Sequence, residues 1–174
     1  MSASDTKAKQ VAMHEAAHIL QAARMGAKKV LIYGAQRRHG RGFHALTEAV
    51  YEEPPIQIVD SARYLAAGGV AEQMLASAPV GDDPVDFEDF VTRAIVAGVA
   101  PKLVQEFWNA ARQDMESYFS LPQVQPHMHA LAARVEAKIK EANEFPQRKL
   151  QCTISELAEI PFLLRLLDRH SKPA

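Results

Sequence analysis

Two histidines four residues apart flank a glutamate near the start of the chain, in the segment His14-Glu15-Ala16-Ala17-His18. If this segment is helical, His14 and His18 lie on one face, because residues four apart in a helix are neighbours. Two imidazoles that point to one place can hold a zinc ion. Glu15, next to the first histidine, can take a proton from a water molecule that the metal activates. The pattern therefore predicts zinc-dependent hydrolysis, and the helical context is its first requirement.

The element that must carry these residues is a helix from about residue 5 to residue 25, and Gly26 suits the position after its end. His14 and His18 lie almost opposite its apolar stripe, so they are either solvated or line a cleft. The glutamate between them favours the cleft. The stripe consists of small and aliphatic side chains: Ala12, Ala16, Ile19, Leu20 and Ala23.

A second helix is predicted from about residue 56 to residue 76, with Gly68 and Gly69 inside it. Each glycine weakens a helix by about 1 kcal/mol, so we expect a reason to keep them. The close approach of another helix is such a reason, and the first helix is the expected neighbour. Glu72, one turn further on, can face the same neighbour. Its ordinary interpretation is an exposed helix glutamate.

Four aspartates, Asp82, Asp83, Asp86 and Asp89, surround the start of a third helix predicted from about residue 85 to residue 97. Such a cluster usually caps a helix and pairs with its dipole. It is also the acidic group best placed in the sequence to supply a third zinc ligand. The residues alone leave these alternatives open.

A β-hairpin is predicted between the first two helices. Residues 29–33 are rich in β-formers, a polar run follows, and residues 43–47 form the expected partner strand. A hairpin beside the metal helix could present an edge to an extended peptide. The residues of that edge would be Phe43, His44, Ala45 and Leu46. A small structural sheet with a solvated turn is an equally weighted alternative.

The remainder of the chain is predicted to be helical, over residues 102–119, residues 126–145 and a last segment. A capping box at Thr153 and Glu156 opens that last segment, and Pro161 breaks or kinks it. The fold class is therefore mainly α, with a small β-hairpin or sheet next to the helix that carries His14 and His18. We expect one domain over residues 1–174, with a metal-site half over about 5–100 and a helical half over about 101–174.

Composition limits the function further. The 174 residues carry a net charge of −1 and show no basic run, which argues against nucleic acid as a partner. Cys152 is the only cysteine, so an internal disulfide and a cysteine zinc site are excluded. No signal-peptide core and no apolar run of about 20 residues is present. These features predict a cytoplasmic protein without a membrane partner.

The order of these motifs resembles the peptidase domain of the FtsH-type zinc proteases, which are membrane-anchored AAA+ enzymes. That family carries H-E-A-G-H on a helix, a β-hairpin, a helix with a G-R-x-A-E-E-type motif, and N-D-L or S-D-F at the start of the next helix. The counterparts here are residues 14–18, the hairpin at residues 30–46, the segment at residues 68–72 and the segment at residues 85–88. The resemblance covers about residues 10–100.

The resemblance implies a zinc ion held by His14, His18 and Asp86, with Glu15 as the catalytic base. Glu72 is then a partner that orients a ligand histidine, or the alternative third ligand. The implied activity is that of a zinc metalloendopeptidase acting on flexible or unfolded polypeptides.

Departures from the family pattern limit what the resemblance implies. Ala17 replaces a glycine, and Gly69 stands where the family often has arginine. The chain shows no Walker A motif, no AAA+ module and no transmembrane anchor, so cleavage is expected to be ATP-independent in the single chain. A separate ATPase and a homo-oligomer both stay open as partners. The rival interpretation is a non-catalytic helical interaction or regulatory module that retains the peptidase fold.

Overall fold

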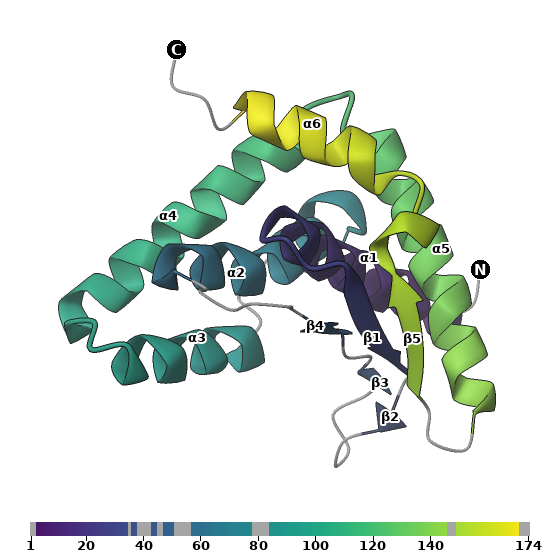
Figure 1. Ribbon diagram of the computed structural model, residues 1–174, viewed down its shortest axis with the longest axis horizontal. Coiled ribbons are helices and arrows are strands. Elements are labelled where there is room, and N and C mark those ends of the chain that lie inside the picture. Colours follow the sequence, from purple (N-terminus) through teal and green to yellow (C-terminus); the bar gives the residue numbers. More distant parts are fainter. Residues whose placement is uncertain are drawn as a thin grey trace.

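The computed structural model describes residues 3–34, 36–37, 43–44, 47–50, 57–77, 84–145 and 149–170. It is mainly helical with a small antiparallel sheet, as predicted (Figure 1). The helices are α1 (Ala3–Arg24), α2 (Ile58–Leu75), α3 (Pro84–Val96), α4 (Pro101–Phe119), α5 (Gln125–Glu144) and α6 (Ile160–His170). The strands are β1 (Lys29–Tyr33), β2 (Gln36–Arg37), β3 (Phe43–His44), β4 (Thr47–Val50) and β5 (Lys149–Thr153). Within the described ranges, no helix has the length and apolarity to cross a membrane.

The carboxyl end of α1 is set by the glycine that the sequence indicates. Gly26 has a φ of +91°, a conformation that residues with a Cβ rarely adopt. Its N–H donates to the carbonyl of Ala23 at 3.0 Å, and the N–H of Ala27 donates to the carbonyl of Ala22 at 2.9 Å. These paired bonds form the glycine-terminated cap that turns the chain from α1 into β1.

Helix α1 lies at the centre of the molecule, where it packs against α2 and α5 and also contacts α6 and the sheet. Its burial extends well beyond the predicted stripe. His18 is only 5% exposed, which excludes the solvated alternative for this residue. Small side chains make this burial possible, because alanines let neighbouring helices approach. The buried residues of α1 are Ala12, Met13, Glu15, Ala16, Ala17, His18, Ile19, Leu20, Gln21 and Ala22.

The predicted strand at residues 29–33 is confirmed as β1, and it forms an antiparallel hairpin with β4. The partner strand is displaced from the predicted residues 43–47, of which Thr47 belongs to β4. β1 pairs with β4 on one side and with β5 on the other, giving the order β4-β1-β5. Phe43–His44 instead forms β3, which pairs with β2 in a separate small sheet. Val30 and Ile32 of β1 point to the buried face, as strand alternation requires. Because β5 comes from the second half of the chain, both halves contribute to this sheet.

The helix boundaries agree with the predictions to within about two residues, which is the usual uncertainty of helix ends. The capping box at Thr153 and Glu156 is present, but it opens one turn of 3-10 helix at Ile154–Glu156. Pro161 does not break the last helix. It lies in the first turn of α6, where a missing N–H costs no hydrogen bond.

The helices form two hydrophobic cores, and α2 and α4 contribute residues to both. The larger core contains residues of α1, β1, α5, β5 and α6, together with the carboxyl-terminal parts of α2 and α4. The smaller core contains Phe90 and Ala94 of α3, and the amino-terminal parts of α2 and α4. Trp108 of α4 stacks on Phe90 there, with ring centroids 5.6 Å apart. Helix α1 therefore belongs to the first core and α3 to the second, and α4 runs from the end of α3 towards α6 (Figure 1).

Candidate metal centre

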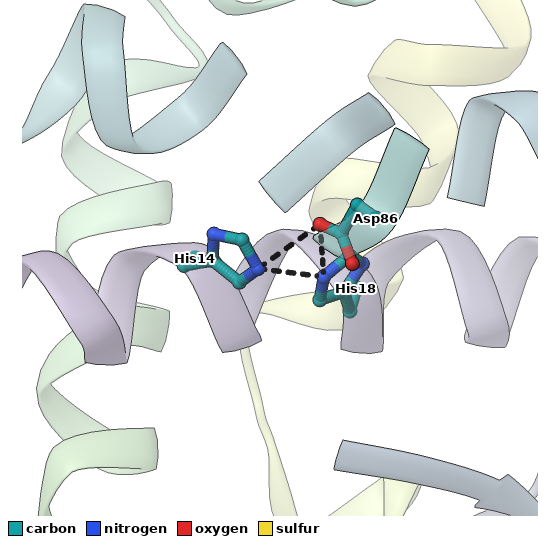
Figure 2. A group of neighbouring side chains, drawn as sticks. All are labelled: His14, His18 and Asp86. Carbon is teal, nitrogen blue, oxygen red and sulfur yellow. Dashed lines mark hydrogen bonds and ion pairs between the residues drawn. The ribbon is translucent and has the colours of Figure 1, made fainter. Parts of the chain in front are cut away.

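Three side chains from two helices converge on one point (Figure 2). His14 and His18 extend from α1, and their Nε2 atoms are 2.9 Å apart. Asp86, in the first turn of α3, reaches them from the other side. Its Oδ2 lies 3.3 Å from Nε2 of His14 and 3.4 Å from Nε2 of His18. The spacing of the two histidines on one helix face thus has the predicted result, and Asp86 lies beside both.

The second ring nitrogen of each histidine, Nδ1, has a partner on α2. Nδ1 of His18 lies 2.8 Å from the backbone carbonyl of Tyr64. Because a carbonyl oxygen only accepts, this Nδ1 carries the proton, and Nε2 of the neutral ring has a lone pair. Nδ1 of His14 lies 3.3 Å from Oε2 of Glu72, and a carboxylate also only accepts. Both lone pairs of the neutral rings therefore point inward, towards Asp86.

Two lone pairs 2.9 Å apart repel each other unless a proton or a metal ion lies between them. Burial lowers the pKa of His14, but the carboxylates of Asp86 and Glu72 outweigh burial and raise it well above the ordinary 6.5. Burial likewise raises the pKa of Asp86, but the two imidazoles lower it further, so Asp86 is ionised. In the metal-free chain, these shifts favour a protonated His14 beside an ionised Asp86, which would relieve the repulsion.

The same atoms fit a divalent metal ion. Zinc binds imidazole nitrogen at about 2.0–2.1 Å and carboxylate oxygen at about 2.0–2.2 Å, so tetrahedral geometry separates ligand atoms by about 3.3 Å. The three separations here are 2.9, 3.3 and 3.4 Å. The Oδ2 atom of Asp86 is fully buried and, beyond the two rings, has no polar partner among the described residues. Two neutral imidazoles and one carboxylate form a donor set that suits zinc and other transition metals.

Two glutamates, Glu72 and Glu15, influence the first histidine. Glu72 faces the Nδ1 side of His14, so it contacts the ring away from Asp86, and its Oε1 lies 3.8 Å from Nζ of Lys7. The hydrogen bond to His14 lowers the pKa of Glu72, so it is ionised. Glu15 is only 4% exposed, and its negative charge contributes to the raised pKa of His14. A carboxylate thus stands next to the cluster without being one of the three converging groups.

The other predicted site residues are placed differently. Asp89 points away and pairs with Arg93 at 2.7 Å, as an ordinary helix aspartate does. Asp82 and Asp83 lie outside the described residues, as do Ala45 and Leu46 of the expected substrate edge. Phe43 and His44 form β3, which contacts α1.

Sequence reasoning did not find two groups near the cluster: the carbonyl of Tyr64, which contacts His18, and Lys7, which pairs with Glu72. The carbonyl of Tyr64 belongs to the backbone, so its role cannot be recognised from the residue type. Its place could be inferred only from spacing, because Tyr64 precedes Gly68 by one helical turn just as Glu72 follows it. Lys7 precedes His14 by two turns and resembles any other surface lysine in the sequence.

The protein is a mainly helical chain with a partly buried His-His-Asp group that could hold a metal ion. Comparison of the chain with models of known protein families, with curated proteins and with solved structures finds no match. The function must therefore be argued from the site itself.

Proposed function

We propose that this protein is a zinc metalloendopeptidase, related to the FtsH-type peptidases, that cleaves flexible or unfolded polypeptides. The observation that carries the proposal is the convergence of Nε2 of His14, Nε2 of His18 and Oδ2 of Asp86 within 2.9–3.4 Å. These residues would hold the ion. Zinc bound there would supply a Lewis acid for the scissile carbonyl and would acidify water.

The second support is the position of Glu15. A metal site that only stabilises a fold needs ligands and no base. Here a buried carboxylate follows the first ligand directly in sequence. In the proposed reaction, Glu15 accepts the proton of the attacking water and passes it to the leaving amine nitrogen. Such a general base contributes about 10²- to 10⁴-fold to the rate.

The test compares Glu15→Gln with the wild type on an internally quenched, unstructured polypeptide, with one equivalent of zinc. We expect the variant to bind zinc like the wild type, because Glu15 is not among the converging groups. Its kcat should fall by about 10²- to 10⁴-fold. Glu106→Gln, an identical change at an exposed position of α4, serves as the control and should keep full activity. Cleavage by Glu15→Gln at the wild-type rate would refute the mechanism.

The alternative function is a non-catalytic interaction module with a structural metal. One observation favours it: the cluster joins α1 of the larger core to α3 of the smaller core, as a structural ion would. The same experiment separates the two functions. A wild-type protein that binds zinc and cleaves no unfolded polypeptide would support the module.

A further inference from the structure

One face of α2 contacts His14 and His18 at successive helical turns. Tyr64, Gly68 and Glu72 are each four residues apart, so they share a face of that helix. His14 and His18 share a face of α1 in the same way. The two helices meet so that Tyr64 contacts His18 and Glu72 contacts His14. Gly68 lies between them, opposite both rings.

The absence of a side chain at Gly68 is what the cluster requires. A Cβ at this position would lie 2.6 Å from Nε2 of His14 and 2.6 Å from Nε2 of His18. It would also lie 2.8 Å from Cδ2 of His14. At distances below 3.0 Å the neighbouring atoms must shift, and here those atoms are Nε2 of His14 and Nε2 of His18. A methyl group would therefore compete for the space that the nitrogens share with a metal ion.

The two neighbours of Gly68 on this face fix how the rings are turned. The Tyr64 carbonyl accepts the Nδ1 proton of His18 at 2.8 Å, and the tyrosine ring packs on the imidazole at 4.9 Å between centroids. Glu72 accepts the Nδ1 proton of His14 at 3.3 Å. Partners of this kind select one tautomer and one orientation of a ligand histidine. Both Nε2 atoms are thereby directed at Asp86.

We propose that the Tyr64–Gly68–Glu72 face of α2 is the positioning surface of the metal centre, with Gly68 as its most sensitive residue. This inference rests on the metal site of the proposed function but does not depend on catalysis. None of the three residues is a catalytic residue here. They act through His14 and His18.

The first experiment compares Gly68→Ala with Gly69→Ala by competition for zinc with a chromophoric chelator. Both variants add one methyl group to the same helix, but residue 69 is turned 100° away and is partly exposed. We expect Gly68→Ala to bind zinc about 100-fold more weakly, the upper end of the loss for contacts that orient ligands. Gly69→Ala should bind like the wild type. Equal affinity of Gly68→Ala and wild type, or equal loss in both variants, would overturn the proposal.

The second experiment removes an orienting group without adding bulk. Glu72→Ala should weaken zinc binding by about 10-fold or more, because Nδ1 of His14 loses its acceptor. Glu72→Gln keeps a side-chain oxygen in place and should recover most of the affinity. If Glu72 had only a structural role, Glu72→Ala and Glu72→Gln would not differ in zinc affinity in this way. No recovery by Glu72→Gln would contradict the positioning role of this residue.

A third measurement separates failure of this inference from failure of the proposed function. A proton–nitrogen NMR spectrum of the metal-free protein reports which ring nitrogen of His18 carries a proton. We expect Nδ1–H in the wild type and a changed ring signal in Gly68→Ala, with circular dichroism showing that the variant is folded. If the wild type shows this tautomer and binds zinc but cleaves no polypeptide, the proposed function fails and the positioning stands. If it shows the other tautomer, the positioning proposal fails.

Discussion

Zinc binding should release one proton from the cluster, and this number follows from the geometry. Nε2 of His14 and Nε2 of His18 are 2.9 Å apart, which leaves room for one proton between them. Asp86 is already ionised in the metal-free chain, because the imidazoles lower its pKa. Metal ligands must be deprotonated, so His14 is the ligand that has a proton to release. The predicted stoichiometry is one ligand proton for each zinc bound, and ionisation of the zinc-bound water adds to it.

The pH dependence has a definite sign. The folded pKa of His14 is raised above its ordinary value of 6.5. In the metal-free protein, His14 therefore contributes stability that is fully present below about pH 6.5 and is lost as pH rises through the higher folded pKa. Zinc affinity has the opposite trend. Over the same window it should rise about tenfold per pH unit, or about 1.4 kcal/mol, and level off above the pKa of His14.

Isothermal titration calorimetry in buffers of different ionisation enthalpy measures this stoichiometry directly. The slope of observed enthalpy against buffer enthalpy gives the number of protons released. We expect a slope of at least one at neutral pH, because the ligand proton and ionisation of the zinc-bound water both contribute. A slope near zero at neutral pH would refute the protonation of His14 in the metal-free protein.

Three further outcomes test individual contacts. Asp86→Asn should weaken zinc binding by at least the roughly 10- to 100-fold that altered orienting partners cost. Asp89→Asn should leave zinc affinity unchanged, because Asp89 forms an exposed pair with Arg93 and is not one of the three converging groups. Equal losses in a chelator competition would contradict this assignment. Phe90→Ala should lower the free energy of unfolding in urea by about 3–5 kcal/mol, since Phe90 is fully buried. The control is Ile95→Ala at an exposed position, which should change the free energy of unfolding by less than about 0.5 kcal/mol. Burial raises the pKa of Cys152 to about 11. Its thiol should therefore react slowly with a maleimide at about pH 8 and quickly once the chain is unfolded. Fast labelling of the folded protein would contradict the burial of Cys152.

The helices could be predicted from sequence because their signals are local. Periodic apolar residues and terminal glycines or prolines define each helix within a short window, as Gly26 and Pro84 show. The close approach at Gly68 was also predictable, because a glycine inside a helix needs a packing reason. Its partner could be named only in general terms, since contact between the two imidazoles and one backbone position depends on the crossing of two helices.

The sheet could not be predicted in the same way. β5 is five residues long, and its partner β1 lies more than a hundred residues away in sequence. Nothing within a local window favours that pairing over the nearby strand at residues 43–47. The extent of burial of α1 was missed for a related reason. Alanine is common on both buried and exposed helix faces, so Ala17 and Ala22 reveal little about what packs on them.

The division into two cores has a consequence for how the molecule comes apart. Asp86 is carried by α3, which is anchored in the smaller core, and both histidines are carried by α1, in the larger one. An ion held by all three would therefore cross-link the two cores, which are otherwise joined through α2 and α4. With the ion bound, the chain should unfold in one cooperative step. Once the ion is chelated, α3 and its contacts with α4 should be the first part of the structure to unfold.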